Sequence, residues 1–353
     1  MKKRWISLLG VTVLVSSLAV YASFDFGSDL GASQTRRIGS HQVDFLSEKE
    51  ADAYLANETD FSLYNSQLDL SLRLGEDRSA YAPDENERQL IELISDAGIP
   101  WHEGQVSTFH DLLETVYGEL NEAGLCIWPD DLKMIKSNGK AQFGAYYTTG
   151  SAIVVPWSQM KFLFVPPRAA QLARTMAHEV WHVASRRDPE LRKRAYEVFG
   201  FERADQFSIP PEIRERIITN PDVEDIGYVV SLGNGTSGQR YLIVLQSETR
   251  EYEGLRSPVG VFSTIADYME VVIYPVTESG EVIDQPQPLE DQLDPRIGTI
   301  SPYRLGPDEV VAEAVEALLA RSAGGPTHPE TTQNSALLDQ LRVALSCGEP
   351  EPK

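Results

Sequence analysis

The chain has 353 residues, a formal net charge of −22 and a hydrophobic fraction of 42%, which is enough apolar material for a sizeable core in one large domain or two moderate ones. A surface this acidic repels phosphate backbones, so the composition argues against a nucleic acid as partner. The two cysteines, Cys126 and Cys347, are too few for a Cys/His metal cluster, although one disulfide could join them in an oxidising compartment.

Residues 1–22 have the layout of a secretory signal peptide. Three cations at positions 2 to 4 precede an uncharged run that closes with small residues at Ala22, so we expect cleavage after that residue. The apolar run is also long enough to serve as an uncleaved membrane anchor. In both cases the remainder is expected to be exported, to the periplasm or the medium, and to meet a membrane only if the anchor is kept.

The rest of the chain is predicted to be an α+β protein. Residues 23–85 are polar and are expected to form an irregular N-terminal extension with one helix over 48–57, followed by a domain over 86–353. Periodicity and turn signals predict helices over 84–98 and 107–124, then a strand, a turn and a hairpin over 126–156, then helices from beyond Pro167 to Arg187 and over 189–199. A β-rich insertion follows at about 226–300, with a hairpin around Asn234 and Gly235 and a loop from 276. The chain closes with a helix over 306–325 and a last helix that ends at Cys347.

The helix before Arg187 contains the run HEVWH, residues 178–182. An α-helix turns about 100° per residue, so His178 and His182 project from one face, one turn apart, and can bind one ion. Glu179 lies close enough to contact a metal-bound water without binding the metal. Two imidazoles and a carboxylate in this arrangement are typical of zinc hydrolases, in which the carboxylate accepts a proton from the attacking water.

The alternative is a core helix whose histidines are satisfied by protein groups. Val180, Trp181 and Val183 make the helix largely apolar. Burial of two rings and a carboxylate among them costs several kcal/mol unless these groups have polar partners. A single bound metal ion can provide that compensation. The sequence therefore favours a Zn²⁺ site.

A tetrahedral zinc ion needs a third protein ligand, and three residues are candidates. Asp188 nearly fits the H-E-x-x-H-x-x-G-x-x-H/D spacing, but Ser185 stands where that pattern requires glycine. Asp222 belongs to an acidic turn. Glu309 and Glu313 share one face of an otherwise aliphatic helix, where one could be a ligand and the other could accept a histidine N–H, or both could be solvated.

These motifs resemble those of the gluzincin metallopeptidases. HEVWH is similar to the active-site helix of zincins, and the run PDEVVAEAV resembles the E-x-x-A-E/D helix that supplies the third ligand in several gluzincins. Residues 125–345 are also similar to a group of uncharacterised exported bacterial HExxH proteins. The departure is the spacing, because 127 residues separate His182 from Glu309, so the β-rich insertion must loop out and return.

The resemblance implies a zincin-like fold with Zn²⁺ bound by His178, His182 and Glu309. Glu179 would be the general base, and Glu313 would match the supporting acid. The segment from Tyr146 to Val155 would be the upstream edge strand that pairs with an extended substrate, and Tyr303 could donate to the oxyanion.

The sequence thus predicts an exported zinc metallopeptidase that acts on peptides or proteins. Two alternatives stay open: an exported scaffold or binding protein with a structural zinc site, and a metal hydrolase that acts on a non-peptide amide or ester. The bonds cleaved, the role of residues 23–85, the pairing of the cysteines and the oligomeric state are not determined by the sequence.

Overall fold

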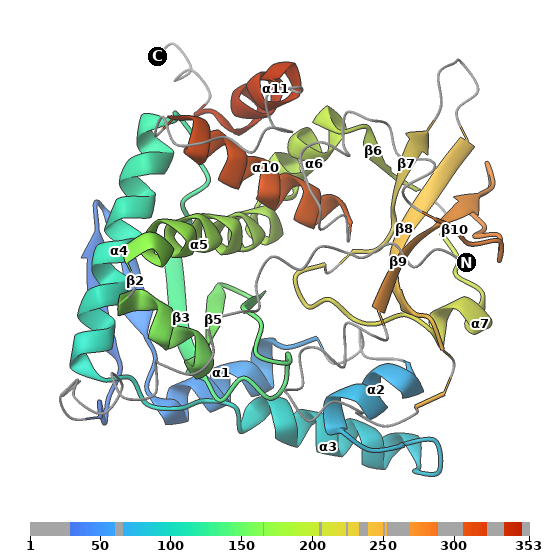
Figure 1. The fold of residues 1–353 in the computed structure, drawn as a ribbon, viewed down its shortest axis with the longest axis horizontal. Coiled ribbons are helices and arrows are strands. Elements are labelled where there is room, and N and C mark those ends of the chain that lie inside the picture. Colours follow the sequence, from blue (N-terminus) through green and yellow to red (C-terminus); the bar gives the residue numbers. More distant parts are fainter. Residues whose placement is uncertain are drawn as a thin grey trace.

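The fold is mixed α and β, in agreement with the predicted class, and contains two separate β-sheets (Figure 1). A computed structural model describes residues 29–60, 66–164, 166–204, 207–223, 225–232, 239–249, 251–252, 269–288, 306–322 and 335–347. The expected signal peptide therefore lies outside the described residues. Within those ranges, none of the helices combines the length and the apolar character that a bilayer-spanning segment requires.

The first sheet has five strands in the order β1-β2-β3-β5-β4. Its strands are β1 (Gln34–Ile38), β2 (His41–Phe45), β3 (Asp131–Ser137), β4 (Tyr147–Thr149) and β5 (Ala152–Pro156). Strands β2, β3 and β5 are parallel, whereas β1 and β4 pair antiparallel at the two edges. The predicted strand and hairpin over 126–156 are confirmed by β3, β4 and β5.

The expectation that residues 23–85 form an irregular extension was wrong. Strands β1 and β2 belong to the first sheet, and β2 pairs in parallel with β3. Only the helix over 48–57 was expected, and it is present as α1 (Glu48–Glu58), followed by α2 (Gln67–Leu74). The strands were missed because each has only five residues and too few apolar positions for a clear alternation: Ile38 in β1, and Val43 and Phe45 in β2.

The other predicted helices begin and end close to their expected residues. They are α3 (Pro83–Ser95), α4 (Glu103–Glu122), α5 (Pro166–Arg187), α6 (Pro189–Val198), α10 (Pro307–Ser322) and α11 (Ser335–Leu345). Two short helices were not predicted: α7 (Pro211–Arg214) and a 3₁₀ helix before α5, η3 (Trp157–Phe164). Helix α4 begins four residues earlier than expected, because His102 and Gln105 form a reciprocal capping box there.

The second sheet is antiparallel and has the order β10-β9-β8-β7-β6. Its strands are β6 (Phe201–Arg203), β7 (Tyr228–Leu232), β8 (Gln239–Ser247), β9 (Met269–Val276) and β10 (Gln287–Pro288). Strands β7 and β8 pair as the predicted hairpin requires, while the turn at Asn234 and Gly235 lies outside the described residues. The sheet begins with β6, before residue 226, so the predicted start of the insertion was too late; β10 lies within the insertion but in its expected loop.

Helix α5 lies at the centre of the molecule, next to α4, α6 and α10 (Figure 1). Its side chains Val180, Trp181 and Val183 are fully buried in the main core. Val311 and Val315 of α10 belong to the same cluster. Burial of these two apolar faces brings α10 against the helix that carries HEVWH, although the two helices are far apart in the chain.

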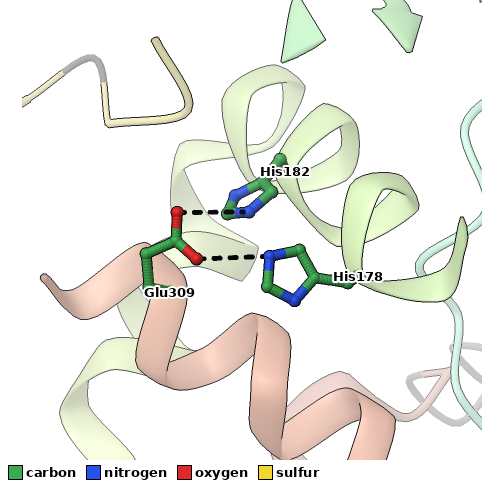
Figure 2. Close-up of side chains that lie close together, drawn as sticks. All are labelled: His178, His182 and Glu309. Carbon is green, nitrogen blue, oxygen red and sulfur yellow. Dashed lines mark ion pairs between the residues drawn. The ribbon is translucent and has the colours of Figure 1, made fainter. Parts of the chain in front are cut away.

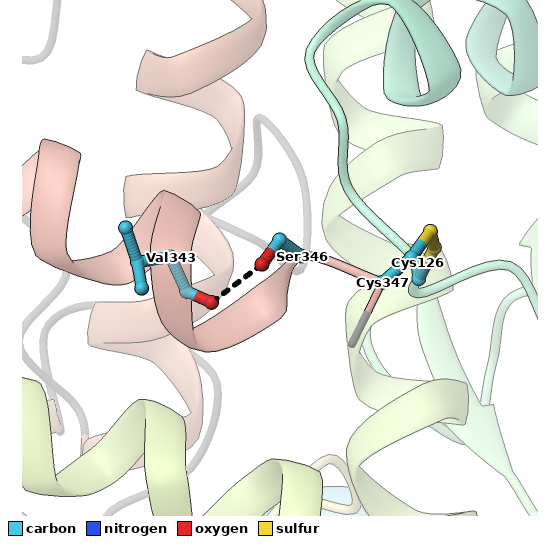
Figure 3. The surroundings of a disulfide bond; sticks show 4 residues. All are labelled: Cys126, Val343, Ser346 and Cys347. Atoms are coloured by element: carbon cyan, nitrogen blue, oxygen red, sulfur yellow. Dashed lines mark hydrogen bonds between the residues drawn. A yellow bond between two sulfur atoms is a disulfide. The ribbon is translucent and has the colours of Figure 1, made fainter. Parts of the chain in front are cut away.

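The two cysteines are joined by a disulfide, which settles a pairing that the sequence left open. Cys126 and Cys347 lie with their Cα atoms 5.2 Å apart (Figure 3). The backbone N–H of Cys126 donates to the carbonyl of Leu345 at 2.8 Å. At the end of α11 the Ser346 hydroxyl donates to the carbonyl of Val343 at 2.8 Å. The C-terminal helix is therefore tied to the segment that precedes β3.

Candidate metal centre

His178 and His182 lie one turn apart on α5, as the spacing predicts. Their ring centroids are 4.8 Å apart in an edge-to-face arrangement. His182 is 1% exposed because α10 covers this part of α5. The apolar neighbours Met176, Ala177 and Val180 are fully buried and hold the helix in the core, so the imidazoles are presented from a rigid element.

Glu309 approaches both histidines from the first turn of α10 (Figure 2). Its Oε2 lies 3.2 Å from Nε2 of His178, and its Oε1 lies 3.9 Å from Nε2 of His182. The three possible ligand atoms all lie within 4.8 Å of one another. Two imidazole nitrogens and one carboxylate oxygen are the ligand set of many catalytic zinc sites.

The two other candidates for third ligand have different partners. The Oδ1 of Asp222 accepts from the backbone N–H of Thr148 at 2.7 Å and from the Thr148 hydroxyl at 2.6 Å. Asp188 caps α6 and accepts from the first N–H groups of that helix. Glu309 is therefore the carboxylate that faces both histidines.

Besides Glu309, Glu316 of α10 contacts His178, whereas the sequence led us to expect Glu313 as the supporting acid. The Oε1 of Glu316 lies 3.0 Å from Nδ1 of His178. A carboxylate at Nδ1 favours the tautomer that leaves the Nε2 lone pair available to a metal. Glu313 is half-buried on the same helix.

Asn220 was missed in the sequence. Its Nδ2 donates to Oε1 of Glu309 at 2.7 Å, so it fixes the orientation of the carboxylate. The preceding residue, Thr219, is held by a buried ion pair: Arg73 donates to the carbonyl of Thr219 at 2.6 Å and to Oδ1 of Asp69 at 3.0 Å. The segment that the sequence analysis placed in the extension therefore supports the site.

Several buried polar atoms at this site have no hydrogen-bond partner among the described residues. They are both ring nitrogens of His182 and Oε2 of Glu179. Glu179 is 4% exposed. Buried polar groups without partners are rare because each costs about 1–3 kcal/mol. A divalent cation between His178, His182 and Glu309 would give His182 a partner, so the residues present fit a bound metal.

The electrostatic states of His182 and Glu309 fit a cation, since ligands must be deprotonated to bind one, whereas His178 would have to release a proton. Burial lowers the pKa of His182 to about 3, which keeps its ring neutral. Burial acts to raise the pKa of Glu309, but the hydrogen bond from His178 and the nearby His182 outweigh it and lower this pKa to about 2. Burial opposes protonation of His178, yet Glu309 and Glu316 together raise its pKa well above 6.5.

Glu179 has a pKa well above its usual value, because burial and the nearby charge of Asp222 both disfavour the carboxylate. Burial and the charge of Glu179 likewise raise the pKa of Tyr146, so this tyrosine is electrostatically coupled to the site. Asp222 itself has a pKa raised to about 7, chiefly by burial and then by the charge of Glu309. Carboxyl groups with raised pKa values are common at catalytic sites.

The segment from Tyr146 to Val155 includes β4, the antiparallel edge strand of the first sheet within the described chain. Part of its outer edge is in use, because the Thr148 N–H donates to Asp222 and the Thr148 hydroxyl accepts from Arg186 at 3.0 Å. A peptide that pairs with β4 would therefore have to leave the Thr148 N–H with Asp222. Tyr303, the expected oxyanion donor, lies outside the described residues.

No protein family, curated protein or solved structure matches the chain. What the site can do therefore follows from its own geometry and chemistry. Its arrangement of two imidazoles, one ionised carboxylate and a second buried carboxyl group is suited to binding a divalent cation and to moving a proton beside it.

Proposed function

We propose that the protein is an exported zinc metallopeptidase of the gluzincin type with a zincin-like domain. The observation that carries the proposal is the convergence of His178, His182 and Glu309, whose ligand atoms lie within 4.8 Å of one another, next to the buried Glu179. A buried helix that carries the histidines and a sheet with an antiparallel edge strand support the zincin-like interpretation.

In this proposal, metal binding, orientation of the ligands and proton transfer are carried out by different residues. His178, His182 and Glu309 would hold Zn²⁺, while Glu316 and Asn220 orient two of these ligands. The bound ion would supply Lewis acidity, which makes water acidic and polarises a carbonyl. The Glu179 carboxylate would accept a proton from the attacking water and return it to the leaving amine, and burial raises its pKa, which makes it a stronger base.

The proposed substrate is a peptide or protein, and the proposed location is outside the cytoplasm. The antiparallel edge strand β4 could pair with an extended peptide chain. The cationic start, the uncharged run and the small residues before Ala22 support export.

One observation favours a catalytic site over a structural zinc site. A structural site is closed by a fourth protein ligand, whereas a catalytic site keeps that position for water. The cluster contains three ligands among the described residues, and Asp222, which the sequence offered as another ligand, accepts two hydrogen bonds from Thr148.

The Glu179→Gln variant tests this proposal. We expect it to keep its zinc and to lose at least about 10²-fold in hydrolysis of a mixed peptide library, because the general base is removed and the ligands are not. The matched control is Glu190→Gln, at an exposed position on α6. This variant should retain both the zinc content and the hydrolysis rate of the wild type. Zinc retention with unchanged hydrolysis would exclude Glu179 as the base. Cleavage of simple amides or esters without peptide cleavage would support a non-peptide hydrolase.

A further inference from the structure

A cavity of about 310 Å³ lies beside the candidate metal centre. Gly306 and Pro307, which lead into Glu309 on α10, line one side of it. Asn220 lines it as well, and the same side chain donates to Oε1 of Glu309 at 2.7 Å. The cavity therefore begins one side chain away from a proposed metal ligand.

The cavity wall is mainly aliphatic. Residues from β8 and from the segment before β7 supply most of it: Ile217, Ile218, Val223, Ile243, Val244 and Leu245. The hydroxyl of Ser66, a polar lining group, already donates to the carbonyl of Glu215 at 2.6 Å. The lining residues include one cation, Arg214, and no carboxylate. Such a wall favours an apolar occupant, because each Å² of apolar surface removed from water contributes about 25 cal/mol.

The cavity opens towards solvent at Ile226, a lining residue that is 40% exposed. Its volume is at the lower end of the range of about 300–1,000 Å³ that is usual for ligand pockets. That space suits one large side chain and is small for an extended ligand.

We propose that this cavity binds a large aliphatic or aromatic side chain of the substrate, next to the bond that is cleaved. The inference rests on the proposed metallopeptidase function, because it is the position of Glu309 that relates the cavity to a scissile bond. Strand β8 thereby determines specificity, which gives the β-rich segment between the two ligand helices a function.

The test uses peptide libraries that contain every residue type on both sides of the cleaved bond. At one of these positions we expect the wild type to prefer Leu, Met or Phe over Ala by at least about tenfold in kcat/KM, which is typical of apolar pockets. Leu245→Trp should fill the cavity, and Ile226→Asp should place a charge at its mouth. Both should reduce the preference to less than about threefold while zinc content is retained.

The matched control is Ile283→Asp, because Ile283 is 37% exposed and does not line the cavity; it should keep the wild-type preference. Peptide cleavage without an apolar preference, or a preference that survives both cavity variants, would overturn the inference. Binding of N-acetyl-leucinamide, compared with N-acetylglycinamide by ligand-observed NMR, gives a readout that needs no activity. The wild type should favour the leucine compound and Leu245→Trp should not; equal binding by both proteins would also refute the inference.

If no peptide is cleaved, the metallopeptidase proposal fails, and the NMR comparison still decides whether the cavity accepts an apolar side chain. If peptides are cleaved with no selectivity at any position, the proposed function stands and the role of the cavity is rejected. The two proposals therefore fail in different experiments.

Discussion

Replacement of Glu316 by alanine should weaken zinc binding even though Glu316 is not a proposed ligand. Its Oε1 lies 3.0 Å from Nδ1 of His178, and the side chain is 31% exposed, so it can be removed without a large cavity. Loss of a carboxylate that orients a metal-binding histidine costs about 10–100-fold in metal affinity, which is about 1.4–2.7 kcal/mol.

The assay is a competition titration against a chelator of known zinc affinity, with Glu313→Ala as the matched control on the same helix. The dissociation constant should rise about 10–100-fold for Glu316→Ala and less than about threefold for Glu313→Ala. Glu316 also raises the pKa of His178, so a proton competes with the metal more strongly in the wild type. The difference between the two proteins should therefore grow as pH increases, because that competition disappears.

The opposite result is that Glu313→Ala weakens zinc binding and Glu316→Ala does not. It would show that Glu313, as the sequence motif indicates, is the supporting acid, and that the contact of Glu316 with His178 does not matter for binding. Unchanged affinity in both variants would show that neither carboxylate orients His178.

Three further predictions concern stability. Arg73→Ala leaves Asp69 buried without its cation, so urea denaturation should show a loss of about 3–5 kcal/mol in the free energy of unfolding. Burial raises the pKa of Asp308 from 3.8 to about 6, so its contribution to stability is greatest below pH 3.8 and is lost as pH rises through 6. Between pH 3.5 and 7, the free energy of unfolding of the metal-free wild type should fall by up to about 3 kcal/mol relative to that of metal-free Asp308→Asn. Replacement of Cys126 and Cys347 by serine removes a disulfide that spans a sequence separation of 221. The free energy of unfolding should fall by at most about 5 kcal/mol, because the unfolded chain gains entropy. An unchanged urea midpoint would argue against a stabilising bridge.

The histidine pair could be predicted from sequence because it depends on one local rule. His178 and His182 are four residues apart on a continuous helix, so their relative placement follows from helix geometry alone. Glu309 could only be nominated, since its approach to the histidines depends on how α10 packs on α5. The choice between Glu313 and Glu316 depends on the crossing of these two helices, which no local pattern specifies.

Asn220 and the first two strands were missed because their roles depend on residues that are far away in the sequence. Asn220 belongs to a turn whose partner, Glu309, is 89 residues away, and an asparagine before a proline is an ordinary turn signal. Strands β1 and β2 bury few side chains, and β2 pairs with β3 across the intervening helices. Their short alternating pattern is weak on its own, and non-local pairing determines the structure that they adopt.

The central claim is tested most directly by the zinc stoichiometry of the purified chain, measured by elemental analysis after saturation and removal of free metal. We expect about one zinc ion per chain in the wild type and in Asp188→Ala and Asp222→Ala, and a large loss in Glu309→Ala. A wild-type protein that takes up no zinc on titration would contradict the account, and so would a Glu309→Ala variant that binds zinc as tightly as the wild type.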